Sequence, residues 1–322
     1  MTISTMRKPS RRPLIFKVGS AIVFVAAALI ILYGFRVASN SPFFNASVFA
    51  DFLKAKIQGQ NAFPGNDGWL FYRCDLVATL EPWIYMRKNV ETIAALSDTL
   101  SRRGIKLIVV SVPYKAAIIQ TYSPFRVGNV SNQRSRMLTI LSKRSVEVID
   151  LAPSFMAENP KDALFQKKDT HWDGHGMLIA ARIISDSINR FLGRAGGQQR
   201  YFFKDTIIFE PRDLGVFLGD TSSYPRSCRM ITMQDGSAFK DSVGSDIMIF
   251  GDSFSFVDHA FGGSIGAQIA YFTNRPTFTI FHICATREPL EMLNFLKNRG
   301  KVPRVIVWVF VSNVLCAKFA PI

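Results

Sequence analysis

The sequence predicts an α/β fold in which a mostly parallel sheet is covered by helices on both faces. Short, nearly continuous apolar runs recur along the chain, as buried parallel strands require. Amphipathic helical segments separate several of these runs, so strand and helix signals alternate from residue 65 onward. At 322 residues the chain is long enough for one large domain of this kind or for two small ones.

Five apolar runs are expected to form the strands: residues 105–112, 146–151, 246–250, 277–283 and 304–311. The last run is too short for a membrane span. Apolar residues at helical spacing predict a helix through residues 90–100, which ends near Gly104. A second, longer helix is predicted from Met177, Ala180, Ala181, Ile184, Ile188 and Phe191, which mark one helical face.

The amino-terminal part of the chain predicts a membrane anchor. Residues 18–35 carry no charge and approach the roughly 20 residues that a helix needs to cross a bilayer. Cationic residues precede this stretch, so residues 1–17 are expected in the cytoplasm and the bulk of the chain outside it. Residues 36–64 would form a spacer and residues 65–322 the exported domain. The alternative is a cleaved signal peptide, for which residues 37–39 offer a cleavage site.

The composition of the chain limits the classes of molecule that we expect it to bind. The chain has 39 Lys and Arg against 24 Asp and Glu, a formal net charge of +15, and these basic residues are scattered. Such a surface suits an anionic polymer or anionic lipid, whereas no nucleic-acid-binding signature is present, so we expect no nucleic acid partner. The four cysteines are widely separated and predict no particular disulfide pairing. Their spacing suggests no metal site, and we expect no cofactor.

One candidate nucleophile is Ser253, which lies in the stretch IFGDSFSF at residues 249–256. An apolar strand ends there in Gly251 and Asp252, and parallel sheets bind ligands beyond the carboxyl ends of their strands. Because Gly, Asp and Ser are also common turn residues, an ordinary turn is the alternative. In that case Asp252 would be the residue that forms the turn.

A serine nucleophile needs a base, and the stretch DTHW at residues 169–172 offers one. Asp169 and His171 are two residues apart, so in an extended loop both side chains point the same way. The carboxylate could then orient the imidazole, whose other nitrogen would face the nucleophile. A structural alternative is that Asp169 caps a turn while His171 packs near Trp172.

A metal site is a further alternative for the same stretch. His171 and His175 are four residues apart and have two aspartates nearby, a spacing that metal ligands can use. Against this, Asp173 resembles a helix N-cap and Gly174 disfavours a helix through both histidines. We therefore predict an acid-base pair and no metal.

Five stretches in this order resemble the SGNH-hydrolase-like domain of the alginate O-acetyltransferases AlgJ and AlgX. They are GNDGWLFY at residues 65–72, VPYK at 112–115, IDL at 149–151, DTHW at 169–172 and GDSFS at 251–255. The resemblance covers residues 60–312 approximately. The chain departs from the family in the Asp-Gly pair after DTHW and in the lack of an acidic residue and arginine after the last strand. We expect it to lack the carbohydrate-binding module that AlgX carries.

The resemblance implies an SGNH-hydrolase-like three-layer α/β/α sandwich, here preceded by one N-terminal transmembrane helix. It implies that Asp169, His171 and Ser253 form a catalytic triad. It further implies a periplasmic, inner-membrane-anchored O-acetyltransferase that receives acetyl groups from a membrane-bound O-acyltransferase. The acceptor would be an exopolysaccharide or another cell-surface glycan, alginate-like in character.

The expected mechanism is an acyl-enzyme on the serine. Backbone N–H groups of Ser253 and Phe254 are predicted to stabilise the oxyanion. Tyr114, Lys115 and Trp172 are candidate substrate-binding residues. The alternative functions are a periplasmic carbohydrate acetylesterase, which would use the same residues, and a non-catalytic acetyl-relay or scaffold partner of the membrane-bound O-acyltransferase.

Overall fold

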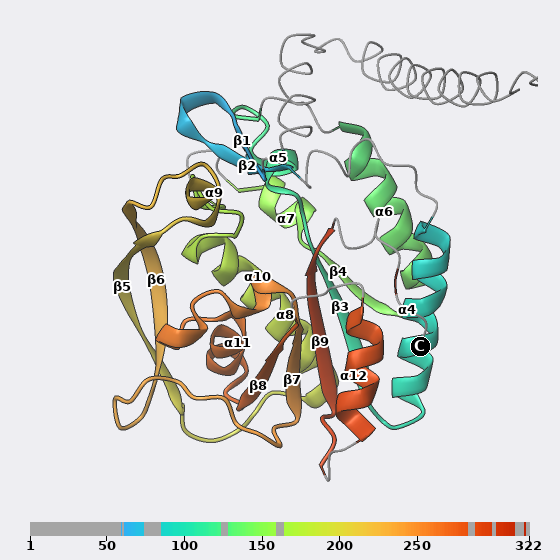
Figure 1. Ribbon diagram of the computed structural model, residues 1–322. Helices are drawn as coiled ribbons and strands as arrows, with labels where there is room; N and C mark the ends of the chain where they lie inside the picture. Colours follow the sequence, from blue (N-terminus) through green and yellow to red (C-terminus); the bar gives the residue numbers. More distant parts are fainter. Residues whose placement is uncertain are drawn as a thin grey trace, which may run out of the picture. The chain divides into compact units, whose positions relative to one another are not determined.

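A five-stranded parallel sheet, in the order β4-β3-β9-β7-β8, forms the centre of the computed structural model (Figure 1). Its strands are β3 (Lys106–Val112), β4 (Glu147–Asp150), β7 (Ile247–Gly251), β8 (Thr277–Phe281) and β9 (Val305–Val311). All five predicted strands are present, and each begins within one residue of its expected start. Because neighbouring strands are parallel, their carboxyl ends meet at one edge of the sheet.

Helices cover both faces of this sheet, which confirms the three-layer arrangement. One face carries α4 (Met86–Ser101), α6 (Gly128–Lys143) and α12 (Glu288–Lys297), and the other carries α8 (Gly174–Leu192) and α11 (Ile265–Thr273). Alternate residues of one strand face opposite layers, since Leu107 and Val109 of β3 belong to the first core and Ile108 and Val110 to the second.

Helix α8 directly follows the DTHW stretch and holds the carboxyl-terminal end of that stretch in place. The side chain of Asp173 accepts from the backbone N–H groups of His175 and Gly176, so it is the predicted N-cap. A Cβ on Gly176 would lie 2.3 Å from the carbonyl oxygen of Leu164, so only glycine allows this loop to pack so closely. Of the predicted apolar face, Phe191 alone is exposed, at 46%.

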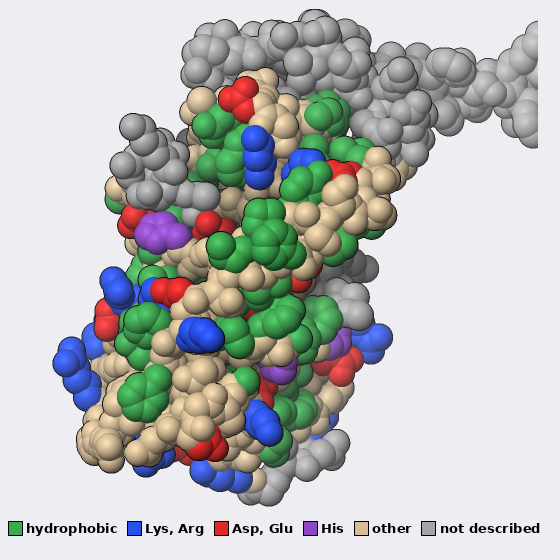
Figure 2. Space-filling view, turned by 90° about the vertical axis from the view of Figure 1, so that its left-hand side faces the viewer, with side chains coloured by type: hydrophobic (Ala, Val, Ile, Leu, Met, Phe, Trp, Pro, Cys, Tyr) green, Lys and Arg blue, Asp and Glu red, His purple; other side chains and the backbone are tan. Residues whose placement is uncertain are grey.

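Two antiparallel pairs lie outside the central sheet, and the sequence did not indicate either. A short hairpin joins β1 (Ala62–Pro64) to β2 (Leu70–Tyr72), so ordered structure begins before the expected domain boundary at residue 65. A two-stranded ribbon joins β5 (Tyr201–Pro211) to β6 (Ser223–Met233). Several of its apolar side chains are exposed among scattered Lys and Arg side chains, on the side of the molecule that Figure 2 faces.

Short helical segments connect the larger elements. They are η1 (Asn66–Gly68), α5 (Lys115–Ile118), α7 (Ala152–Met156), α9 (Asp213–Val216), α10 (Ser253–Phe256) and η2 (His259–Phe261). Three of them, α9, α10 and η2, contribute residues to the cleft described below.

The structure describes residues 59, 61–73, 85–123, 128–158, 164–282, 287–297, 301–312 and 319, all within a compact unit that spans Asp51–Ile322. The expected anchor at residues 18–35 and the cysteines Cys74, Cys284 and Cys316 lie outside these ranges. Cys228 is buried and has no disulfide partner among the residues that the structure describes. Within the described ranges, no helix has both the length and the apolar character needed to cross a bilayer.

Candidate active site

Asp169 and His171 form a hydrogen-bonded pair in the loop before α8. Oδ1 of Asp169 lies 2.7 Å from Nδ1 of His171 and also accepts from the backbone N–H of His171 at 3.0 Å. The first contact orients the imidazole, and the second holds the carboxylate against the backbone of His171. The other ring nitrogen, Nε2, has no hydrogen-bond partner among the described residues. The pair therefore has the geometry of an oriented base whose reactive nitrogen is unoccupied.

The electrostatics of the pair agree with this role. Burial lowers the pKa of His171, but the hydrogen bond and charge of Asp169 outweigh burial, so the pKa lies above its ordinary value of 6.5. Burial raises the pKa of Asp169, but its contacts with His171 outweigh burial and hold the pKa well below its usual range. Asp169 is therefore ionised over the pH range in which His171 takes up a proton, and its charge stabilises the imidazolium.

Asp213, at the start of α9, completes the local network. Its carboxylate accepts from the backbone N–H of Thr170 at 2.8 Å, and its own N–H donates to Oδ2 of Asp169 at 3.2 Å. Burial and then the neighbouring Asp169 raise the pKa of Asp213. Asp213 thus ties α9 to the DTHW loop, although the two segments are about 40 residues apart in sequence.

Asp169, His171 and Asp213 bring possible ligand atoms within 4.8 Å of one another, so their spacing would suit a metal ion. Backbone N–H groups already occupy three of the four carboxylate oxygens, and Nδ1 of His171 faces Asp169. These contacts fit an acid-base pair better than a ligand set. His175, the second histidine of the metal alternative, instead lies 3.3 Å from Glu158.

Lys115 holds the DTHW loop in place from inside the protein core. Its side chain is 1% exposed, and Nζ donates to the carbonyl oxygens of Leu70, Gln166, Lys167 and Asp169 at 2.6–3.1 Å. An ammonium that binds β2 and the loop together holds Asp169 in place. Lys115 is therefore a structural residue in this fold.

The other two candidate substrate-binding residues are buried as well. Tyr114 lies in the core, and Trp172 packs its ring edge-on against Phe254 with 5.3 Å between ring centroids. This burial argues against the predicted contact of Tyr114, Lys115 and Trp172 with a substrate. Lys115 and Trp172 instead support the segments around His171.

Ser253 lies where the sequence predicted, at the carboxyl end of a central strand and at the start of α10. A Cβ on Gly251 would come within 2.0 Å of the carbonyl oxygen of Val309, so the chain can pass β9 only with glycine there. Asp252 forms the turn, since its carboxylate accepts from the N–H groups of Phe254 at 3.0 Å and Val311 at 2.8 Å. Burial raises the pKa of Asp252 to about 6.

Ser253 is close to the Asp-His pair in the fold but is not bonded to it. Its side chain is exposed, and no hydrogen bond joins it to His171 in the described structure. Both of its neighbours interact with His171: Asp252 through its charge, and Phe254 through a ring contact at 4.9 Å between centroids. Catalytic hydrogen bonds are often long before substrate binds.

The predicted oxyanion donors differ in availability. The N–H of Phe254 donates to Oδ1 of Asp252 and is therefore not free to bind an oxyanion, which corrects the prediction for this residue. The N–H of Ser253 has no such partner among the described residues. A short helix starts at Ser253, so its first N–H lacks an intrahelical acceptor.

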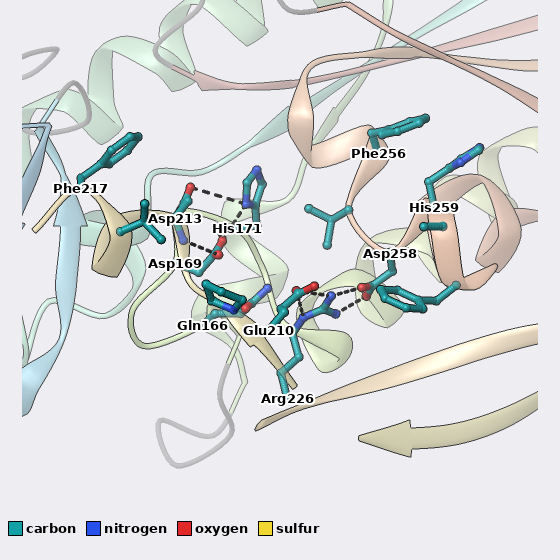
Figure 3. Close-up of a pocket in the computed structure, with 15 residues that line it drawn as sticks. Gln166, Asp169, His171, Glu210, Asp213, Phe217, Arg226, Phe256, Asp258 and His259 are labelled. Atoms are coloured by element: carbon teal, nitrogen blue, oxygen red, sulfur yellow. Dashed lines mark hydrogen bonds and ion pairs between the residues drawn. The ribbon is translucent and has the colours of Figure 1, made fainter. Parts of the chain in front are cut away.

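A cleft of about 520 Å³ opens beside His171 (Figure 3). Figure 3 shows Asp169, His171 and Asp213 on one side and Phe256, Asp258 and His259 across from them. Its lining residues are Gln166, Asp169, His171, Glu210, Pro211, Asp213, Val216, Phe217, Arg226, Phe256, Val257, Asp258, His259, Ala260 and Phe261. The lining residues from β5, β6, α9 and η2 could not be predicted from local sequence, because only the fold brings them together.

A family model described as the SGNH hydrolase-like domain of the acetyltransferase AlgX matches residues 62–271, which is more than half of the chain. The chain belongs to this family. It is 25% identical over 278 residues to the probable alginate O-acetylase AlgJ of Pseudomonas putida, a match that covers 79% of this chain and 70% of that protein. This AlgX-family chain is accordingly an O-acetyltransferase.

Solved structures agree on the fold. The O-acetyltransferase domain of Pseudomonas putida AlgJ matches with a TM-score of 0.65 at 20% identity, covering 81% of this chain and 94% of that one. AlgX of Pseudomonas aeruginosa matches with a TM-score of 0.57 at 17% identity, covering 78% of this chain and 61% of that one. These matches confirm the predicted SGNH-like α/β fold for the AlgX-family chain.

Proposed function

We propose that this AlgX-family enzyme transfers acetyl groups to polysaccharide hydroxyls through an acetyl-enzyme on Ser253. The observation that supports this mechanism best is the Asp169–His171 pair, which leaves Nε2 unpartnered next to the element that bears Ser253. A serine hydroxyl is a weak nucleophile unless an adjacent base takes its proton.

In the first half-reaction, Oγ of Ser253 attacks the acetyl carbonyl of the donor. The proton of Oγ passes to Nε2 of His171, a new Oγ–C bond forms, and the ester C–O bond of the donor breaks. His171 then gives the proton to the departing oxygen. Asp169 stabilises the imidazolium that forms in between. The N–H of Ser253 is the donor within this turn that is free to face the oxyanion.

In the second half-reaction, a sugar hydroxyl takes the place of the donor. Its proton passes to Nε2 of His171, its oxygen bonds to the acetyl carbon, and the Oγ–C bond breaks. His171 returns the proton to Ser253, so the enzyme is unchanged after one cycle. The cleft beside His171 is the space in which this acceptor would bind.

The cellular setting is part of the same proposal. The uncharged stretch at residues 18–35, with basic residues before it, supports an enzyme anchored in the inner membrane with its domain in the periplasm. An export partner that resembles a membrane-bound O-acyltransferase would supply the acetyl groups. The names of the AlgJ and AlgX relatives support a polysaccharide as the acceptor.

The test is acetylation of the full-length enzyme by an activated acetyl ester, followed by acid quenching and peptide mass spectrometry. One acetyl group is expected on the peptide that contains Ser253, and Ser253→Ala should lose both this adduct and acetate release. Ser227→Ala, which removes an exposed serine on β6, is the matched control and should retain both. Acetate release by Ser253→Ala at the rate of the parent enzyme would refute the serine mechanism.

A second measurement separates transfer from hydrolysis. Polysaccharide isolated from a strain that lacks the enzyme should carry fewer acetyl groups than polysaccharide from its parent. Complementation with Ser253→Ala should not restore them. Full restoration by that variant would point to the non-catalytic relay, and a larger number of acetyl groups in the deletion strain would point to an acetylesterase.

A further inference from the structure

A second Asp-His pair lies at the cleft. His259 of η2 lines the cleft across from His171, as Figure 3 shows. Nε2 of His259 lies 3.0 Å from Oδ2 of Asp241, and the same oxygen accepts from the backbone N–H of Thr279 at 2.9 Å. An ionised carboxylate only accepts hydrogen bonds, so Nε2 carries the ring proton. Nδ1 of the neutral ring therefore presents a lone pair.

Nδ1 of His259 is open to a ligand. No hydrogen bond joins it to another residue that the structure describes, and it is not buried. The side chain of His259 is 30% exposed. By contrast, Nε2 of His171 is buried, next to the turn that bears Ser253. The two pairs are thus suited to different partners, because His171 serves the serine and His259 can be reached by a molecule in the cleft.

The ring of His259 is held in place on two sides. Its edge binds Asp241, and its face stacks on Phe256 with 4.2 Å between ring centroids and 14° between planes. Phe256 stacks in turn on Phe281 and is the last residue of α10, the helix that begins at Ser253. A group that is fixed before binding loses little conformational freedom when a ligand arrives.

The charged side chains of the ribbon wall are already paired. Arg226 donates to Glu210 from Nε at 3.0 Å and also binds Asp258, and Arg212 donates to Glu210 at 3.2 Å. A ligand that bound these groups would compete with buried ion pairs. Contact with Nδ1 of His259 breaks none of these bonds, so the contact carries no such cost.

We propose that His259 binds the acceptor, with Nδ1 accepting a hydrogen bond from a sugar hydroxyl other than the one that is acetylated. Asp241 positions the ring. This inference rests on the proposed transfer function. The acetyl-enzyme can react with a sugar hydroxyl or with water, and a contact away from the reacting atoms holds the sugar in the attacking position. His259 thereby favours transfer over hydrolysis.

Two amide substitutions separate acceptor binding from support of the fold. The amide of asparagine reaches only as far as Nδ1 of the histidine that it replaces, whereas the amide of glutamine reaches the position of Nε2. His259→Asn therefore keeps a hydrogen-bonding group at the cleft and loses the contact with Asp241. His259→Gln keeps a contact with Asp241 and loses the group at the cleft.

The experiment expresses the full-length parent and both variants, at levels matched by immunoblot, in a strain that lacks the enzyme. Transfer is measured as acetyl groups on the polysaccharide of that strain. Acetate release from an activated acetyl ester and thermal unfolding are measured on the purified enzymes. His175→Gln is the matched control, because His175 pairs with Glu158 outside the cleft, and it should match the parent in transfer and acetate release.

With both activities expressed relative to the parent, we expect His259→Gln to lower transfer about 2- to 10-fold more than acetate release. This is the effect of one lost hydrogen bond. His259→Asn should transfer more acetyl than His259→Gln, although it should unfold at a lower temperature. Transfer and stability would then rank the two variants in opposite orders, which a purely structural role cannot produce.

Transfer by His259→Asn that is equal to or below that of His259→Gln would overturn the inference, because activity would then follow the Asp241 contact. An equal fall of transfer and acetate release in His259→Gln would also overturn it, since the residue would then act on the acetyl-enzyme. Failure of the proposed function looks different: the parent enzyme itself would carry no acetyl adduct on Ser253.

Discussion

Replacing Asp169 with Asn is the sharpest test of the Asp-His pair, because it keeps the shape of the side chain and removes one acceptor. Oδ1 of Asp169 accepts from both Nδ1 and the backbone N–H of His171, and Oδ2 accepts from the N–H of Asp213. An asparagine has one oxygen and one NH₂ group in these positions. Whichever way it turns, one of these N–H groups faces another donor.

The size of the effect follows from which contact is lost. If the NH₂ group faces His171, the imidazole must carry its proton on Nε2 and cannot take one from Ser253. Loss of one charge-assisted hydrogen bond costs about 1.5–3 kcal/mol, or roughly 10- to 100-fold. The wrong tautomer extends the loss to about 10⁴-fold in a triad. We therefore expect kcat/KM for acetate release to fall by about 10²- to 10⁴-fold.

The assay is acetate release from an activated acetyl ester across pH, with Asp173→Asn as the matched control. Oδ1 of Asp173 alone accepts from the N–H groups of His175 and Gly176, so an asparagine keeps both contacts. Asn is as good an N-cap as Asp, so activity and thermal stability should change little. If Asp169→Asn retained more than about a tenth of the parent activity, the pair would not be the catalytic base system.

Three further outcomes are expected. Because the pKa of His171 lies above 6.5, kcat/KM should rise with pH through an apparent pKa above that value, and a profile that is flat from pH 5 to 9 would exclude His171 as the base. Arg226→Met leaves a buried carboxylate unpaired and should lower the free energy of unfolding by about 3–5 kcal/mol in urea denaturation. Arg229→Met, which breaks an exposed pair on the same strand, should cost about 0–1 kcal/mol, and equal losses would contradict this difference. Lys115→Met should destabilise the fold and reduce activity together, whereas exposed Lys167→Met should do neither.

The central sheet could be predicted from sequence because its strands are buried on both faces. Such strands appear as continuous apolar runs, and β3, β7 and β9 are clear examples. The ribbon of β5 and β6 could not be predicted in this way. Its strands expose Phe203, Ile207 and Phe209 alongside charged residues, so apolar and polar positions follow neither helical nor strand periodicity.

The residues of the site likewise differ in whether local sequence can predict them. The hydrogen bond between Asp169 and His171 spans two residues and depends on local geometry, so sequence spacing was enough to predict it. Asp213 reaches the pair only through the packing of α9, about 40 residues further along the chain, so no local pattern predicts it. Lys115 shows the opposite error, because a residue that was expected to contact the substrate instead supports the site from inside the core.

The charge of the whole chain differs from the charge inside the cleft. The formal net charge of +15 is spread over the sequence, and Figure 2 shows Lys and Arg side chains dispersed over one face. Over distances beyond about 8 Å, salt screens such charges, so they influence encounter with anionic surfaces more than the bound pose. Within the cleft the charges are carboxylates and the guanidinium of Arg226, and Arg212 binds the lining residue Glu210 as well. The net charge of the chain therefore influences which surface the enzyme approaches and does not describe the charge inside the cleft.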